Sequence, residues 1–200
     1  MEKEEILSKI KEEALEKHVP IIEDEPLELI KVILKLKKPN KILEVGTAVG
    51  YSAINFSKYL VGENAKLKTI EIKEEMYNKA MENITAMQLN DKIEVINADA
   101  TEYMKSIPDD EQYDVVFIDA AKGQYLVFLE EAIRLTRNGG VIIADNMLYR
   151  GRTLSDYNEH KHRTATNRLR EYLVTMKEDK RLDSTLIKIG DGLAISIVNK

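Results

Sequence analysis

The sequence has 200 residues, of which 44% are hydrophobic and 32% charged, with a formal net charge of −5; this composition is typical of a soluble domain with a full core. It contains no cysteine, which excludes disulfides, thiolate metal sites and cysteine nucleophiles. No apolar run approaches the roughly 20 residues that span a bilayer, and the charged N-terminus does not resemble a signal peptide, so we expect a cytoplasmic protein without membrane contact.

Two helices are expected before the first strand. Residues 2–17 place Ile6, Ile10 and Ala14 four residues apart, which predicts an amphipathic helix with a narrow apolar stripe. Residues 23–37 form the second predicted helix, which ends in lysines ahead of Pro39. Because no repeat or linker follows, we expect one domain over residues 1–200, with residues 1–38 packed on the core or on a partner subunit.

Residues 41–52, KILEVGTAVGYS, predict a strand, a glycine turn and a helix start. Free backbone N–H groups and the helix N-terminus face a ligand at such a corner. The turn differs from the dinucleotide fingerprint G-x-G-x-x-G, because Ala48 stands at the middle position between Gly46 and Gly50. Glu44 precedes the turn and disfavours a pyrophosphate, but it suits a cationic ligand with an amino group. These residues therefore favour S-adenosylmethionine over a nicotinamide dinucleotide.

Strand-like and helix-like segments alternate after this corner. Further strands are predicted at residues 67–72, 92–98, 113–118 and 141–144, with helices at 74–88, from about 101, and at 123–136 before Asn138-Gly139-Gly140. This alternation predicts right-handed crossovers and a parallel sheet. The tail predicts a helix at 164–177 and a hairpin of strands 184–189 and 193–198 around Gly190-Asp191-Gly192. The expected fold is Rossmann-like α/β, with a seven-stranded, mostly parallel sheet, a C-terminal antiparallel hairpin and helices on both faces.

Every predicted parallel strand ends at or just before a carboxylate, namely Glu44, Glu71, Asp99, Asp119 and Asp145. Ligands of open α/β sheets bind beyond the carboxyl ends of the strands, so five acids there are hard to explain as helix caps alone. At the second strand end, Glu71 can accept hydrogen bonds from ribose hydroxyls, and Asp99 can reach an adenine edge. Ser52, at the helix start, can help backbone N–H groups to hold a methionine carboxylate.

Asp119 and the pair Asp145-Asn146 follow neighbouring predicted strands and should converge. Three oxygen donors without His or Cys suit Mg²⁺, Mn²⁺ or Ca²⁺ better than zinc. An Asp-Asn pair alone is more often a turn or cap, but Asp119 opposite it favours a metal. Lys122 follows at the start of a predicted helix, and near a metal its ammonium pKa should fall, which makes it a candidate general base. The alternative is a solvent-facing helix lysine.

Four motifs, LEVGTAVGYSAI, FIDAAKGQY, IIADNMLYRG and GDGLAIS, resemble those of a known family. They are similar to motifs of the metal-dependent O-methyltransferases of the catechol and caffeoyl-coenzyme A type, and the resemblance covers residues 18–198. Within that family the chain most resembles the bacterial tRNA 5-hydroxyuridine methyltransferases, in which HVPI, DAAKGQY and GDGLAIS recur. The resemblance implies the class I methyltransferase fold and, with the N-terminal stripe, a homodimer.

The resemblance also implies roles for single residues. It makes Asp119, Asp145 and Asn146 the Mg²⁺ ligands and Lys122 the catalytic base, with Asp119 beside it as a second catalytic residue. It implies that S-adenosylmethionine is bound by Ile22, Glu44, Gly46, Ser52, Glu71, Asp99, Ala100 and Asp119. One departure is Ala98, where many relatives carry glycine, which bears on the backbone approach of Asp99 and Ala100 to adenine.

The segment 150–170 bears on the substrate, because it directly follows the Asp-Asn pair and carries six basic residues against two acidic ones. Basic clusters bind phosphates, and tyrosines such as Tyr149 and Tyr157 can stack on unpaired bases. The alternative is a solvated helix and loop. A small phenol would not need this charge, so tRNA is the expected partner. Its candidate contacts are Tyr149, Arg150, Arg152, Lys161 and Arg163.

The predicted reaction is methyl transfer to the 5-hydroxyl of 5-hydroxyuridine at the wobble position of a tRNA anticodon, giving 5-methoxyuridine. The alternative substrate is a small catechol-like or caffeoyl-CoA-like phenol, because it too presents two adjacent oxygens to one ion, and chelation lowers the hydroxyl pKa and aligns the oxygen. Two other classes stay open. A noncatalytic nucleic-acid-binding protein would need neither Asp119 nor Asp145-Asn146, and a nicotinamide oxidoreductase would need the missing G-x-G turn.

Overall fold

The computed structural model describes residues 2–120, 122–155 and 160–200. Its contacts divide the chain into two compact units, Met1–Ala100 and Thr101–Lys200, and each unit is described by itself. The single domain expected from the sequence remains a prediction. Among the described residues, no helix is long and apolar enough to cross a membrane.

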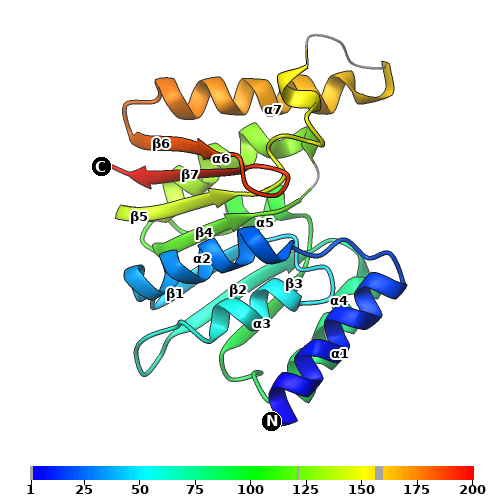
Figure 1. Cartoon of the computed structure of the whole chain (residues 1–200). Helices are drawn as coiled ribbons and strands as arrows, with labels where there is room; N and C mark the ends of the chain where they lie inside the picture. The colour runs from blue at the N-terminus through cyan, green and yellow to red at the C-terminus, as the bar shows by residue number, and fades with distance from the viewer. Residues whose placement is uncertain (1, 121, 156–159) are drawn as a thin grey trace. The chain divides into compact units, whose positions relative to one another are not determined.

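The first unit alternates helices and parallel strands (Figure 1): α1 (Glu2–Glu16), α2 (Asp24–Lys37), β1 (Lys41–Val45), α3 (Tyr51–Ser57), β2 (Lys66–Glu71), α4 (Glu74–Ala86) and β3 (Ile93–Asn97). Its strands are ordered β3-β2-β1, and Ile42 of β1 lies opposite Leu67 of β2. Ile42, Leu43 and Val45 are fully buried, as a nearly continuous apolar run in a parallel strand should be. Both α3 and α4 pack on β2 and β3. The turn that leads from β1 into α3 meets the end of β2, where the Gly46 N–H donates to the Ile70 carbonyl.

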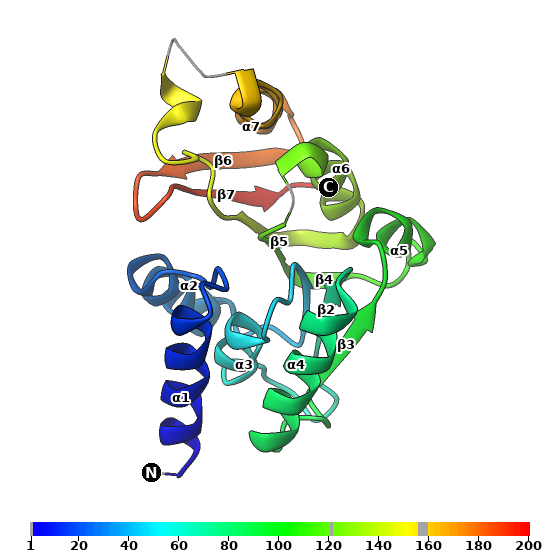
Figure 2. The ribbon, with the colours of Figure 1, turned by 90° about the vertical axis from the view of Figure 1, so that its right-hand side faces the viewer.

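The second unit begins at Thr101, within α5 (Ala100–Ser106). Its further elements are β4 (Tyr113–Ile118), the 3₁₀ turn η1 (Lys122–Gln124), α6 (Tyr125–Leu135), β5 (Thr136–Ala144), the 3₁₀ turn η2 (Arg152–Leu154), α7 (His160–Glu178), β6 (Leu182–Ile187) and β7 (Leu193–Val198). Its strands are ordered β4-β5-β7-β6, with β4 parallel to β5 and β7 antiparallel to both neighbours. The predicted hairpin is therefore confirmed. Helix α7 packs on α6 and β6 and is seen end-on in Figure 2.

Several predicted boundaries in the second unit are wrong. Strand β5 begins at Thr136 rather than at 141, because the register shift opposite Tyr113 and the left-handed Gly139 (φ 70°) accommodate the Asn-Gly-Gly segment as an irregularity within the strand. Helix α6 begins at Tyr125 after a 3₁₀ turn, and β6 begins at Leu182 rather than at 184. Helix α7 begins at His160 rather than at 164, and in its first turn His162 contacts Tyr149 of the preceding loop.

Tyr172 of α7 offers a test of packing between α6 and α7. Its ring meets that of Tyr125 edge-on at 5.8 Å, and its fully buried hydroxyl has no hydrogen-bond partner among the described residues. Burial raises the pKa of Tyr172, so the hydroxyl stays protonated. Because Tyr172→Phe keeps the ring and removes an unpaired polar group, we expect the free energy of unfolding to rise by about 1 kcal/mol in urea denaturation.

Tyr125→Phe is the matched control, because the Tyr125 hydroxyl donates a hydrogen bond to the carbonyl of Asp145 at 3.0 Å. That variant should lose about 1 kcal/mol. A loss of similar size in Tyr172→Phe would show that the Tyr172 hydroxyl is paired in solution.

Candidate active site

The turn after β1 adopts a backbone conformation that needs support. Gly46, Ala48 and Gly50 all have left-handed φ values, of 100°, 46° and 82°. A left-handed alanine costs about 1–2 kcal/mol, so neighbouring contacts must hold it. The backbone N–H of Gly46 donates to the carbonyl of Ile70 at 3.0 Å, and that of Ala48 donates to Glu71 Oε2 at 2.9 Å. The end of β2 therefore shapes the turn.

Glu71 connects the turn to the other predicted cofactor residues. Its second carboxylate oxygen accepts the Lys73 backbone N–H at 2.9 Å, and its side chain is almost fully buried. The Ala98 N–H donates to the Glu71 carbonyl at 3.1 Å, and this bond places the segment that leads to Asp99 and Ala100 beside the end of β2. Each carboxylate oxygen has a second lone pair, so Glu71 can still accept ribose hydroxyls. The structure thus groups the turn, Glu71 and the Asp99 segment, although their roles stay predictions.

The remaining predicted cofactor residues have different settings. Glu44 is fully buried, and its Oε2 accepts a hydrogen bond from the Thr69 hydroxyl at 2.5 Å. The Thr69 hydroxyl also lies 2.6 Å from that of Thr47, so Glu44 is linked to the turn through two hydroxyls. Ser52 is the second residue of α3, as predicted, and Ile22 is buried between α1 and α2. Their contacts with a ligand remain predictions.

In the second unit the three predicted metal ligands come together. Ile118 and Ala144 lie opposite one another at the ends of β4 and β5, and Asp119 and Asp145 follow them directly. Asn146 Nδ2 donates to Asp119 Oδ1 at 2.9 Å, and the Asn146 backbone N–H donates to Asp145 Oδ1 at 2.6 Å. Among the described residues no three His, Cys, Asp or Glu side chains form a metal cluster, so a cation here would need the amide oxygen of Asn146 as its third side-chain donor.

Lys122 lies in η1, a 3₁₀ turn, so the prediction that it begins an α-helix is wrong and the helix-dipole cost expected there does not arise. Burial lowers the pKa of Lys122, whereas the nearby carboxylates of Asp119, Asp191 and Asp145 raise it. Burial also raises the pKa of Asp119, and Lys122 opposes that shift. An amine whose pKa is lowered by burial beside carboxylates can accept a proton from a substrate.

Three residues of this site were not assigned to it from the sequence. The Tyr125 ring centroid lies 5.9 Å from Lys122 Nζ. Asp191 accepts the Leu148 N–H at its carbonyl (2.7 Å) and the Arg150 N–H at its carboxylate. His162 Nδ1 lies 2.9 Å from the hydroxyl of Tyr149. Tyr125 and Asp191 stand within the motifs FIDAAKGQY and GDGLAIS, and His162 lies in the basic segment 150–170 that follows the predicted metal ligands. These were the signals that could have found them.

Some basic side chains of the segment 150–170 make contacts within the protein. Arg168 pairs with Glu171 at 2.9 Å, and Arg170 donates to the carbonyls of Thr153, at 2.9 Å, and Ser155. The exposed members of the predicted tRNA set are Arg150, Lys161 and Arg163, and Arg152 and Tyr149 are half-buried. Tyr157, also proposed to stack on bases, lies outside the described residues. The surface charge available to a phosphate is thus smaller than the residue count predicts.

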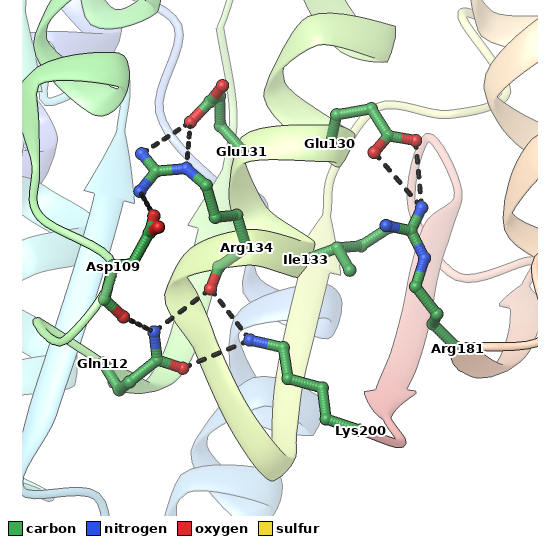
Figure 3. Close-up of a pocket in the computed structure, with 8 residues that line it drawn as sticks. All are labelled: Asp109, Gln112, Glu130, Glu131, Ile133, Arg134, Arg181 and Lys200. Carbon is green, nitrogen blue, oxygen red and sulfur yellow. Dashed lines mark hydrogen bonds and ion pairs between the residues drawn. The ribbon is translucent and has the colours of Figure 1, made fainter.

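A depression of about 610 Å³ is lined by residues of α6, by the segment just before β4 and by Lys200 (Figure 3), and Asp119 and Asp145 are not among its lining residues. Its arginines are paired with carboxylates: Arg134 with Asp109 at 2.6 Å and with Glu131 at 2.7 Å, and Arg181 with Glu130 at 3.1 Å. Its remaining basic group, Lys200 Nζ, donates to the Arg134 carbonyl at 2.8 Å, so these side chains serve internal contacts and we assign the depression no catalytic role.

Comparison with known proteins identifies the family. The O-methyltransferase family matches residues 1–199 of this sequence. The chain belongs to the O-methyltransferase family. A catechol O-methyltransferase from Niastella koreensis is 28% identical over 176 residues, covering 84% of this chain and 78% of that protein. A caffeoyl-CoA O-methyltransferase from Stellaria longipes is 29% identical over 175 residues, covering 83% of this chain and 71% of that protein.

Solved structures confirm the fold of this O-methyltransferase. A Staphylococcus aureus protein described as a caffeoyl-CoA O-methyltransferase aligns with a TM-score of 0.88 at 30% identity, over 96% of this chain and 92% of that one. A Klebsiella pneumoniae O-methyltransferase structure aligns with a TM-score of 0.88 at 23% identity, over 98% and 90%. The predicted class I methyltransferase fold and the S-adenosylmethionine-dependent O-methyltransferase class of caffeoyl-CoA and catechol type are therefore confirmed. The tRNA specificity, the metal and the dimer stay predictions.

Proposed function

We propose that this O-methyltransferase transfers the methyl group of S-adenosylmethionine to one hydroxyl of a small phenol that carries two adjacent oxygens, as a catechol does. The observation that carries the proposal is the hydrogen-bonded pair of Asp119 and Asn146, with Asp145 beside it and the Lys122 amine close by. Relatives named for catechol and caffeoyl-CoA support a phenolic substrate. The turn at 46–50 and Glu71 would bind the cofactor.

The donor set of Asp119, Asp145 and Asn146 fits a hard divalent cation such as Mg²⁺, because it offers two carboxylates and one amide oxygen and no nitrogen or sulfur ligand. Mn²⁺ and Ca²⁺ accept the same donors. When bound, such a cation lowers the pKa of a phenolic hydroxyl and orients it. Burial raises the pKa of Asp119 because it disfavours the charged carboxylate, and a bound cation would stabilise that charge.

The chain's own residues account for proton movement and exclusion of water. Neutral Lys122 accepts the hydroxyl proton at Nζ, and burial keeps the amine in its neutral form more often than in water. S-adenosylmethionine bound at the turn 46–50 would supply the methyl group to the phenolate oxygen, with the methyl–sulfur bond breaking to leave S-adenosylhomocysteine. The rings of Tyr125 and Tyr149, with centroids 5.9 and 5.4 Å from Nζ, limit access of water to the amine.

A second candidate substrate is 5-hydroxyuridine in tRNA, whose 5-hydroxyl lies beside the 4-carbonyl and so offers the same pair of oxygens. It is favoured by one observation: Arg150, Lys161 and Arg163 are exposed near Tyr149 in the sequence that follows the predicted metal ligands. Phosphate binding by such residues weakens as salt rises, whereas capture of a small phenol should not.

Metal removal tests both candidates. We expect EDTA to abolish methylation of 3,4-dihydroxybenzoate and added Mg²⁺ to restore it, measured as transfer of labelled methyl from S-adenosylmethionine. Full activity after rigorous metal removal would contradict the proposal.

A parallel assay should use tRNA carrying 5-hydroxyuridine, with salt varied between about 50 and 200 mM. Catechol turnover that is insensitive to salt supports the main proposal. Turnover of tRNA alone, falling with salt and weakened by Arg163→Ala, would replace it with the second candidate.

A further inference from the structure

We propose that His162 is a positioning residue that holds the ring of Tyr149 against Lys122. The inference rests on the proposed function, because it concerns the surroundings of the proposed base. It assigns a role to a histidine in the first turn of α7 and to its hydrogen bond across to the loop that follows β5.

The loop from Asn146 to Gly151 needs such an anchor. Asn146, Tyr149 and Arg150 have left-handed φ values of 60°, 48° and 54°, which non-glycine residues adopt only when contacts hold them. Asp191 fixes the middle of the loop through the N–H groups of Leu148 and Arg150. These bonds restrain the backbone but leave the Tyr149 side chain free to choose its rotamer.

The Tyr149 side chain is fixed from α7. Its hydroxyl lies 2.9 Å from His162 Nδ1, and the two rings meet edge-on at 5.5 Å with an interplanar angle of 81°. In this position its ring centroid lies 5.4 Å from Lys122 Nζ and 5.3 Å from Arg152 Cζ. Both distances suit a cation–π contact, so the ring that His162 holds also restrains the Lys122 ammonium.

Helix α7 is well placed to transmit this restraint. Its Thr166 is buried, and the Thr166 hydroxyl donates to the His162 carbonyl at 2.9 Å. The helix also packs on η1, which contains Lys122. One helix therefore contacts the turn that carries the amine and, through His162, the ring beside it. Loss of the His162 bond should let the Tyr149 ring rotate away, so that Lys122 loses its fixed geometry.

Five variants test the bond with activity as the readout. His162→Ala and Tyr149→Phe each remove one partner and should lower kcat on 3,4-dihydroxybenzoate about tenfold, the cost of losing one positioning hydrogen bond, while KM for S-adenosylmethionine stays unchanged. The double variant should lose no more than either single one. His162→Asn places its amide near the Nδ1 position and should restore kcat, whereas His162→Gln reaches only the Nε2 position and should not.

His160→Ala is the matched control, because His160 is exposed in the same turn of α7, and it should leave kcat unchanged. Additive losses, with the double variant losing more than either single variant, would overturn the proposal, as would rescue by Gln and Asn alike.

A second measurement needs neither substrate nor metal. The chain has three histidines, so imidazole ¹⁵N signals can be assigned with His18→Gln, His160→Ala and His162→Asn. Tyr149→Phe should shift the His162 signals and leave the other two in place. An unshifted His162 signal would overturn the inference, as would a shifted signal with unchanged kcat, and in the latter case the proposed function would stand. Absence of turnover in the wild-type protein would overturn the proposed function and the positioning role with it, even where the NMR contact is seen.

Discussion

Asp145→Ala should abolish methyl transfer while leaving S-adenosylmethionine binding nearly unchanged. Asp145 is buried beside Asn146 and Asp119, so alanine would remove one of two carboxylates from the predicted metal site. We expect kcat to fall by at least about 100-fold, beyond the 10- to 100-fold typical of residues that only support a metal ligand. The predicted cofactor residues other than Asp119 belong to the first unit, whereas Asp145 belongs to the second.

The measurement combines turnover on 3,4-dihydroxybenzoate, titrated with Mg²⁺, and calorimetric binding of S-adenosylmethionine. Asp110→Ala serves as the control, because Asp110 is an exposed carboxylate of the same unit. Retained turnover in Asp145→Ala would remove the metal hypothesis. A parallel loss of cofactor binding would instead mean that the substitution damages the fold.

Replacing Lys122 with methionine should lower kcat by about 10²- to 10⁴-fold, the range for loss of a general base. Lys122→Arg should be equally inactive, because arginine keeps the charge but does not lose its proton. In the wild-type protein the rate should rise with pH as the amine loses its proton. Since burial lowers the pKa of Lys122, the plateau should come at lower pH than an ordinary lysine would give.

The pH dependence of kcat on 3,4-dihydroxybenzoate checks this prediction, with Lys180→Met, a substitution of an exposed lysine, as the control. The rise should vanish in Lys122→Met and remain in Lys180→Met. An active Lys122→Arg variant would show that the residue supplies charge and is not the base.

Much of the fold could be predicted because its strands are buried apolar runs that end in a carboxylate. The runs before Glu71 and Asp119 end where β2 and β4 end. The Asn138-Gly139-Gly140 pattern predicts a break before the strand, yet this segment lies inside β5. A local sequence pattern does not reveal that an irregular register with β4 can accommodate these glycines inside a paired strand.

The candidate site was predictable where it follows from parallel pairing and hidden where it depends on loop conformation. Asp119 and Asp145 come together because neighbouring parallel strands end at the same edge. The bonds of Arg150 to Asp191 and of Tyr149 to His162 arise only after non-glycine residues adopt left-handed conformations, for which the sequence has no signal. Counting charges likewise overstated the basic surface, since a count does not show that Arg168 and Arg170 have internal partners.

The double role of Glu71 has a consequence for turnover. Its two carboxylate oxygens hold the backbone of Ala48 and Lys73, so under the proposed function the nucleoside end of the cofactor would enter a preorganised cradle, at little cost in ordering entropy. The nucleoside that this cradle would hold is the same in the sulfonium cofactor and in its thioether product. S-adenosylhomocysteine should therefore bind with an affinity similar to that of S-adenosylmethionine. We expect its release to be the rate-limiting step of turnover.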